Sequence, residues 1–350
     1  MELYENGLRL GYTTGTCAAG AAYAGALLLE GEQREKINIL TPAGIDVDLD
    51  VLDLHMDGEW AVAAIRKDSG DDPDVTDKIL IYAKIRKTQN PTTIDGGVGI
   101  GTITKKGLYG EIGEKAINPV PKKMILQAVQ SVSDDNYEII IFVPDGETVG
   151  KRTYNSNLGI VGGISIIGST GIVHPMSEDA LLKTIELEVN VVKEEHGTDN
   201  ILLVPGNYGE KMQAAYKLDI PHVQMSNYIG DALKYAYQAG FRNITLLGHI
   251  GKFSKLSLGI FNTHSKNCDT RMEAFAFYLF LLGAPRDFIM KVLSLNTAEE
   301  AMNLCVESGY KQAIIDMQRG AEARIKRYLK DPDLNVRVYI YSMEGGLVDD

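Results

Sequence analysis

The sequence is poor in cysteine, has no excess of basic residues and contains no long apolar run. Cys17, Cys268 and Cys305 form an odd, scattered set, which excludes a disulfide framework and a CxxC metal pair and predicts a reducing, cytoplasmic location. The net charge of −12 leaves no basic stripe for nucleic-acid phosphates or for an anionic membrane surface. No run approaches the ~20 apolar residues of a membrane span. The start, MELYENGLRL, also lacks the basic-then-apolar order of a signal peptide.

The length and the glycine content predict two domains with many loops that ligands can approach. A chain of 350 residues exceeds what one hydrophobic core usually organises, and we expect domains at residues 1–195 and 196–350. The 36 glycines make up about a tenth of the chain, against the usual ~7%. Many loops are therefore expected to take a positive φ or to bring the backbone close to a ligand.

The first half is predicted to be an α+β domain. A helix is expected over Thr13–Gly31, where small residues require something to pack closely against the helix backbone. Strands are expected over residues 37–40, 45–54, 60–66 and 79–85, and the Asp57-Gly58 turn indicates a hairpin. Because the strands cluster together and outnumber the helices, an α+β layer is favoured.

The second half is predicted to be an α/β domain with a parallel, Rossmann-like sheet. Strands are expected over Ile201–Val204, His222–Met225 and Asn243–Leu247, each followed by a glycine-containing turn. A long loop is expected after GHIGK, then helices over residues 268–282, 297–307 and 311–329 and a strand over 336–341. Repeated strand–loop–helix units imply parallel strands, and ligands bind such sheets where strands end and helices begin.

Three turns at these strand ends are the main ligand-binding candidates. They are Gly206-Asn207-Tyr208-Gly209, Ser226-Asn227-Tyr228-Ile229-Gly230 and Gly248-His249-Ile250-Gly251-Lys252. Glycine lets the backbone approach a ligand, and the helix that follows offers free N–H groups to a carboxylate or phosphate. Any α/β protein needs such turns, but three on one rim favour a nucleoside or carboxylate site.

Nucleotide-binding motifs are incomplete. Lys252 is not followed by the Ser or Thr of a P-loop. The segment GGVGIGT at residues 96–102 follows a polar loop and lacks the third glycine of a dinucleotide fingerprint. Kinase and dehydrogenase interpretations are therefore weakened.

The remaining reactive side chains have ordinary explanations beside the functional ones. The acidic loop Lys67–Asp77 does not have EF-hand spacing; a solvated acidic turn is the more frequent explanation, and Asp71 as a general base is the alternative. His264 and Cys268 stand at i and i+4, but two ligands are too few for a metal site. His264 is therefore expected to orient a substrate or to cap a helix. Cys17 is interpreted as a small packing residue.

Six segments of the chain resemble one protein family. They are LRLGYTTGTCAAGAA (8–22), KDSGDDPDVTD (67–77), GLYGEIGEKAINPVPKKMI (107–125), TYNSNLGIVGGISIIGSTGIVHPMS (153–177), PGNYG (205–209) and GHIGKFSKLSLGIFNTHS (248–265). In this order, over nearly the whole chain, they resemble the cobalt-precorrin-5B C1-methyltransferases, the CbiD family of anaerobic cobalamin synthesis. Ser169, Phe253 and Ser257 depart from the usual family residues but remove no charge.

The resemblance implies a two-domain enzyme that transfers a methyl group from S-adenosylmethionine to cobalt-precorrin-5B, giving cobalt-precorrin-6A. Cobalt arrives bound in this substrate, so no protein metal site is expected. We assign the methyl donor to Gly206, Asn207, Tyr208, Gly209, Asn227, Tyr228, Gly248 and His249. We assign the carboxylate-rich acceptor to Thr13, Thr14, Thr16, Lys252, Lys255, Thr263 and Ser265. Asp71 and His264 are the candidate catalytic residues, as proton acceptors with water as a competitor.

Two other functions stay open at the level of the sequence. A non-catalytic corrinoid carrier would bind the macrocycle without the donor. A phosphoryl-transfer enzyme would use the glycine turns, although the missing Walker motif speaks against it. The sequence is compatible with a monomer and with a homodimer.

Overall fold

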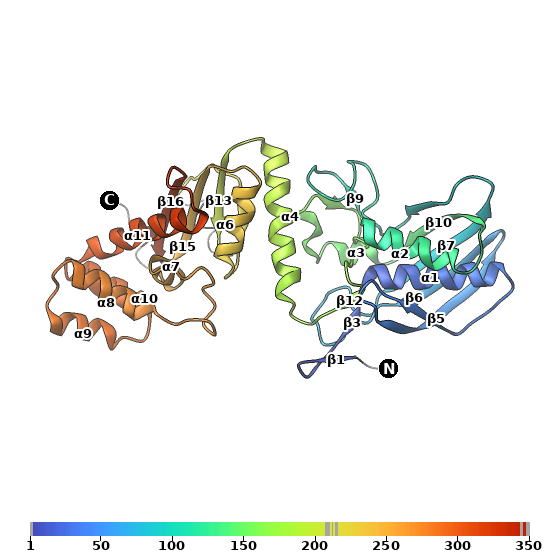
Figure 1. Cartoon of the computed structure of the whole chain (residues 1–350), viewed down its shortest axis with the longest axis horizontal. Helices are drawn as coiled ribbons and strands as arrows, with labels where there is room; N and C mark the ends of the chain where they lie inside the picture. Colours follow the sequence, from blue (N-terminus) through green and yellow to red (C-terminus); the bar gives the residue numbers. More distant parts are fainter. Residues whose placement is uncertain (1–2, 207–210, 212, 214–215, 344–345, 348–350) are drawn as a thin grey trace. The chain divides into compact units, whose positions relative to one another are not determined.

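The computed structural model describes residues 3–206, 211, 213, 216–343 and 346–347. The chain divides into two compact units, Met1–Glu178 and Asp179–Asp350 (Figure 1). The division falls at the start of helix α4 (Glu178–His196), whose last turn holds the boundary expected from the sequence. Ile185 and Val189 of α4 lie in the hydrophobic core of the second unit, which explains why the helix belongs to that unit.

The first unit is built on a six-stranded mixed sheet. Its strands are β4 (Lys36–Leu40), β5 (Asp46–Asp57), β6 (Trp60–Arg66), β7 (Leu80–Thr88), β8 (Thr93–Gly96) and β10 (Asn136–Phe142), in the order β4-β5-β6-β7-β10-β8. Neighbouring strands are antiparallel except β10 and β8. The predicted hairpin is confirmed, because Asp57 pairs with Trp60 and Gly58 takes a φ of +60° in the turn.

Helices α1 (Thr14–Leu29) and α2 (Pro119–Gln130) lie side by side over this sheet (Figure 1). A Cβ atom added to Gly20 would lie 2.6 Å from Cδ1 of Leu49, and one added to Gly25 would lie 2.5 Å from Cγ2 of Ile85. Glycine and alanine therefore let α1 approach the strands closely. The predicted helix with a closely packed backbone is confirmed.

Short elements complete the first unit. They are β1 (Tyr4–Glu5), β2 (Leu8–Arg9), β3 (Gly11–Tyr12), β9 (Thr102–Ile103), β11 (Ile160–Val161), β12 (Ile172–Val173), α3 (Gly146–Gly150) and a 3-10 helix over Tyr154–Ser156. Strand β3 pairs with β12, so the residues that start α1 lie beside the segment that precedes β12.

The second unit contains a five-stranded sheet. Its strands are β13 (Asn200–Val204), β14 (His222–Gln224), β15 (Asn243–His249), β16 (Asn335–Ser342) and β17 (Gly346–Leu347), in the order β14-β13-β15-β16-β17. The first four are parallel, and β17 is antiparallel to β16. The sheet is therefore mixed, and the expectation of a wholly parallel sheet is wrong at this edge. A strand as short as β17 has no periodic sequence pattern that would reveal it.

Helices of the second unit pack on this sheet and on one another. Besides α4 they are α6 (Ile229–Gln238), α7 (Ile250–Ser257), α8 (Arg271–Leu281), α9 (Arg286–Leu293), α10 (Ala298–Glu307) and α11 (Lys311–Leu329). The long loop expected after GHIGK is wrong, because α7 begins at once. Ile250, Phe253 and Leu256 are fully buried at helical spacing, a pattern that the early Gly251 obscured. Helix α9 was also missing from the prediction.

Candidate functional site

The carboxyl ends of β14, β13 and β15 lie at the same edge of the second sheet. These strands are parallel neighbours, with Leu203 of β13 paired to Val223 on one side and to Leu246 on the other. Open α/β sheets bind their ligands beyond this edge. The described residues at these strand ends or just beyond them include Gly206, Asn227, Tyr228, His249 and Lys252, which we call the edge site.

His249 is held in the edge site by two neighbours. It caps helix α7, where its Nδ1 accepts the main-chain N–H of Gly251 at 3.1 Å. In the neutral ring Nε2 therefore carries the proton, and it donates this proton to Oε2 of Glu299 at 2.5 Å. The other carboxylate oxygen of Glu299 accepts the N–H of Met343 at 2.8 Å. One glutamate thus joins the first turn of α10 to the ends of β15 and β16.

Glu299 is a site residue that the sequence reasoning missed. It lies 50 positions from His249 and belongs to the first turn of α10, where Thr297 and Glu300 form a capping box. An acidic residue in a first helical turn already has a sufficient local explanation in the helix dipole. The sequence therefore gave no signal that pointed to the histidine.

The segment after α7 contacts the turn between β14 and α6. The main-chain N–H of Thr263 donates to the carbonyl of Asn227 at 3.0 Å, and the two side chains are joined at 3.3 Å. Tyr228 and Asn262 form an antiparallel bridge. The structure thus brings together Asn227 and Tyr228, which were predicted to bind the methyl donor, and Thr263, which was predicted to bind the acceptor substrate.

The two lysines of α7 are buried to different degrees. Nζ of Lys252 donates to the carbonyl of Ser226 at 3.3 Å, and burial, together with the nearby charge of Lys255, lowers the pKa of Lys252. Lys255 is only 4% exposed, and its Nζ donates to the carbonyls of Thr263 at 2.7 Å and Cys268 at 3.1 Å. Burial also lowers the pKa of Lys255. Lys255 therefore anchors the segment after α7, and Lys252 is the better placed of the two to meet a ligand.

Two predicted glycines of the site have different surroundings. A Cβ atom added to Gly206 would meet no atom within 4 Å among the described residues. A Cβ atom added to Gly248 would lie 2.3 Å from Cε1 of Phe253, so the packing of α7 already requires this glycine. Asn207, Tyr208 and Gly209, which were assigned to the donor, lie outside the described residues.

His264 and Ser265 are exposed in the segment after α7. The main-chain N–H of His264 donates to Oδ1 of Asn262 at 3.1 Å, and its Nδ1 accepts the N–H of Lys266 at 3.1 Å. The histidine therefore shapes a turn next to Thr263. Its role as a proton acceptor and that of Ser265 in substrate binding stay predictions.

Three predicted substrate residues of the first unit, Thr13, Thr14 and Thr16, are buried at the start of α1. The hydroxyl of Thr13 caps the helix by accepting the N–H of Thr16 at 3.3 Å, and that of Thr16 donates to the carbonyl of Gly171 at 2.7 Å. The hydroxyl of Thr14 accepts the N–H of Ile167 at 2.8 Å. These hydroxyls fasten α1 to the segment before β12, and their contact with substrate stays a prediction.

The acidic loop of the first unit is tied to the start of the chain. Both terminal nitrogens of Arg9 bond the carboxylate of Asp68, at 2.5 and 2.8 Å, and these bonds lower the pKa of Asp68. Asp71 accepts the main-chain N–H of Arg9 at 2.7 Å. Lys67 is 2% exposed and pairs with Asp74 at 2.8 Å. Asp71 is therefore an ordered, exposed carboxylate, and its role as a base stays a prediction.

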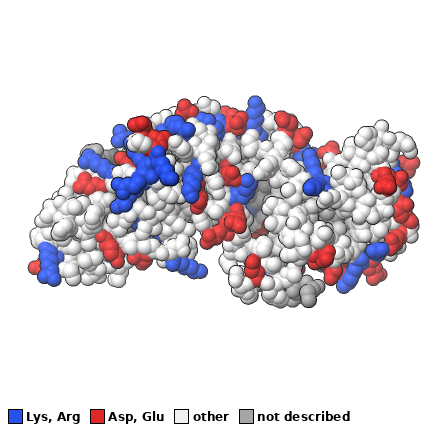
Figure 2. Space-filling view, in the orientation of Figure 1, with Lys and Arg blue, Asp and Glu red and all other residues white. Residues whose placement is uncertain are grey.

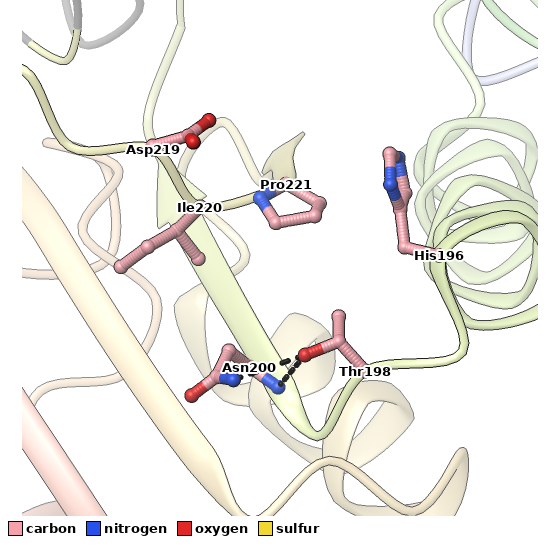
Figure 3. A pocket seen from close by; sticks show the side chains of 6 residues that line it. All are labelled: His196, Thr198, Asn200, Asp219, Ile220 and Pro221. Carbon is pink, nitrogen blue, oxygen red and sulfur yellow. Dashed lines mark hydrogen bonds between the residues drawn. The ribbon is translucent and has the colours of Figure 1, made fainter.

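An open pocket of about 510 Å³ lies at the opposite edge of the second sheet. Its lining, shown in Figure 3, consists of His196, Thr198, Asn200, Asp219, Ile220 and Pro221. Asn200 starts β13 and Pro221 precedes β14, so the pocket lies at the amino ends of these strands. Ligands of open α/β sheets bind at the other edge, and we assign this pocket no role.

The described residues show neither a metal centre nor a membrane span. Within that part of the chain, no three His, Cys, Asp or Glu side chains gather so that they could hold an ion. No helix in it combines the length and the apolar character that crossing a bilayer requires. All three cysteines are free, and burial raises the pKa of Cys17 to about 12, which fits a packing residue.

Many proteins that bind small molecules share a mixed α/β architecture and an open sheet edge with a buried lysine. Comparison with known proteins gives more specific information about the family of this chain. The CbiD family model matches residues 1–175, and that of the CbiD C-terminal domain matches residues 262–350. Two relatives named cobalt-precorrin-5B C(1)-methyltransferase cover most of the chain. That of Alkaliphilus oremlandii is 54% identical over 97% of this chain and 96% of its own, and that of Treponema denticola is 53% identical over 98% and 96%. The chain therefore belongs to the CbiD family.

A solved structure is also similar to the chain. It is described as a cobalamin biosynthesis protein (cbiD) from Archaeoglobus fulgidus and is 30% identical in sequence. The similarity covers 77% of this chain and 86% of that one, with a TM-score of 0.43.

Proposed function

We propose that this chain is an enzyme that methylates C-1 of cobalt-precorrin-5B with S-adenosylmethionine, giving cobalt-precorrin-6A in anaerobic cobalamin synthesis. The observation that carries the proposal is the identity of 53–54% to relatives of that name over nearly the full length of both chains. Similarity that spans both units argues for a shared activity rather than for one shared ligand-binding module. We place the reaction in the cytoplasm, in keeping with the free cysteines.

The edge site is the proposed place of the methyl donor, in a Rossmann-like arrangement of β14, β13, β15 and β16. S-adenosylmethionine supplies an electrophilic methyl group and carries an adenosine and a methionine carboxylate. No described residue would contact a Cβ atom at Gly206, which is consistent with room for the ligand, and the ammonium of Lys252 is a cation close to the strand ends. Asn227 supplies amide hydrogen bonds and Tyr228 an aromatic surface. His249, held by Glu299, completes the wall of the site.

The acceptor macrocycle is proposed to contact the segment after α7. It carries several carboxylates, which Lys252, Thr263 and Ser265 would bind through charge and hydroxyl groups. Lys255 would act mainly by anchoring this segment. We further propose that the first unit forms the family-specific domain and the second unit the donor-binding domain. Thr13, Thr14 and Thr16 are the proposed substrate contacts of the first unit.

Methyl transfer from a sulfonium is an in-line displacement that needs no covalent enzyme intermediate. The ring carbon forms the new C–C bond while the S–CH₃ bond breaks, and the sulfur leaves as a neutral thioether. The protein's task is to align the two reactants and to exclude water. Asp71 or His264 is proposed to accept the proton that the conjugated ring later loses, if water does not.

The test is a titration with S-adenosylhomocysteine, a titration with cobalt-precorrin-5B and one product assay. Isothermal titration of the folded chain with S-adenosylhomocysteine should show binding, and incubation with cobalt-precorrin-5B and the donor should give a product heavier by one methylene. Macrocycle binding without donor binding would instead establish a corrinoid carrier. Absence of donor binding to folded protein would refute the methyltransferase.

A further inference from the structure

Helices α8 and α9 carry an exposed apolar surface. On α8, Phe277, Phe280 and Leu281 are 45%, 72% and 60% exposed, and on α9, Met290 and Leu293 are 54% and 36% exposed. The three residues of α8 stand at i, i+3 and i+4, which places them on one side of the helix. The two helices pack against each other, and Figure 2 shows few charged side chains over this end of the second unit. We call these five residues the hairpin face.

The hairpin face supplies most of the apolar area that a stable protein interface buries on one partner. Taking ~200 Å² for each aromatic side chain, Phe277 and Phe280 together leave roughly 230 Å² exposed. Leu281, Met290 and Leu293 bring the apolar area to about 400 Å². A standard interface buries ~800 Å² on each partner, of which roughly 450–500 Å² is apolar. The hairpin face supplies most of that amount.

The charges beside the hairpin face are complementary to a second copy of the same face. Asp287 and Lys291 are exposed one turn apart on α9, and no ion pair is recorded for either among the described residues. A two-fold axis that passes beside the exposed side of α9, at the level of Ile289, sets two copies of the helix antiparallel. Asp287 of each copy then faces Lys291 of the other, which gives the reciprocal contact of an isologous interface. A chain with a net charge of −12 is, in contrast, poorly suited to lay this face on an anionic membrane.

We propose that the hairpin face is the interface of a homodimer, with the pairs Asp287–Lys291 on either side of the two-fold axis and Phe280 buried against the partner subunit. The proposal does not depend on methyl transfer, because no residue of the edge site takes part. It adds to the proposed enzyme a defined second subunit whose contacts are confined to α8 and α9.

The test is the mass of the full-length chain in solution, measured by sedimentation velocity and light scattering. The wild type should have twice the chain mass of 38.3 kDa. Phe280→Asp should give a folded monomer, because the side chain is 72% exposed in the single chain and its replacement removes little from the core. The matched control is Val98→Asp in the first unit, where the side chain is equally 72% exposed; this variant should remain a dimer.

Charge reversal tests the predicted geometry separately. Asp287→Lys and Lys291→Asp should each raise the dimer dissociation constant about fivefold or more, because each puts like charges together on both sides of the two-fold axis. The double variant should return close to the wild-type constant. A monomeric wild type would overturn the proposal, as would a dimer that Phe280→Asp leaves intact. A double variant weaker than both single variants would overturn the antiparallel pairing.

Discussion

Replacing Glu299 should weaken donor binding through His249, without any contact between Glu299 and the ligand. Its carboxylate accepts the Nε2 proton of His249 at 2.5 Å and the N–H of Met343 at 2.8 Å. The two side chains are 21% and 32% exposed, so water would partly replace the lost bonds. We expect Glu299→Ala to lower the free energy of unfolding by about 2 kcal/mol, near the lower limit for a hydrogen bond to a charged group plus a second bond.

The effect on donor affinity follows from the freed imidazole. A side chain that must be ordered on binding costs about 0.5–1.5 kcal/mol, which corresponds to an about two- to tenfold higher Kd for S-adenosylhomocysteine. Glu299→Gln retains an acceptor oxygen and should lie between the wild type and the alanine variant. The affinities are measured by isothermal titration and the stabilities by urea unfolding. The ¹⁵N shifts of His249 should report the Nε2–H tautomer in the wild type and a mixture of tautomers in Glu299→Ala.

Glu300→Ala is the matched control on the same helix. Glu300 closes the capping box with Thr297 at 3.1 Å, so its loss should cost about 1 kcal/mol of stability and leave donor affinity unchanged. Equal losses of affinity in the two variants would show that α10 acts only through general stability. Unchanged affinity in Glu299→Ala would refute the role of the His249–Glu299 pair.

Three further predictions use separate parts of the chain. Lys252→Met should raise the Kd of the anionic macrocycle about tenfold and that of the donor less. Burial lowers the pKa of Lys252, so its ammonium loses its charge at a pH below the usual pKa of lysine. Wild-type affinity for the macrocycle should therefore fall as the pH rises towards the usual lysine pKa, and the variant should not show this fall. Gly70→Ala should lower the free energy of unfolding by about 3 kcal/mol or more, because φ is +65° and the new Cβ would lie 2.1 Å from the carbonyl oxygen of Arg9. In the same urea assay Gly44→Ala should cost about 1 kcal/mol, because φ is +74° but no described atom lies within 4 Å of the new Cβ. Native protein at mild alkaline pH should react with a thiol reagent at Cys268. Cys17, whose pKa is raised to about 12 by burial, should react only after unfolding. Rapid labelling of Cys17 in the native protein would contradict the packing shown by the structure.

Local periodicity predicted most elements of the fold. The strands expected over Ile201–Val204 and Asn243–Leu247 correspond to β13 and β15, and the helix expected over residues 311–329 is α11. These segments are long or strongly apolar, so their own side chains determine their structure. The failures were segments in which a glycine or a short length conceals the pattern, as for α7 after Gly251 and for the two-residue β17.

The features of the site that could not be predicted from the sequence are contacts between residues far apart in the chain. Asn227 and Thr263 were both predicted site residues, but their hydrogen bonds depend on how the segment after α7 folds back on the β14–α6 turn. Glu299 was missed because its partner is distant in sequence. Lys255 was expected to bind substrate, yet its burial and its bonds to two carbonyls depend on the packing of α7, which no local pattern contains.

The paired main-chain and side-chain bonds between Asn227 and Thr263 have a thermodynamic consequence. If the donor meets the first residue and the macrocycle the second, each ligand restricts the same piece of backbone, so the second to arrive has less motion left to suppress. Mutual enhancement of the two affinities by one common factor is then required by linkage. The two residues would thus couple the donor subsite to the acceptor subsite and favour the ternary complex over either binary complex.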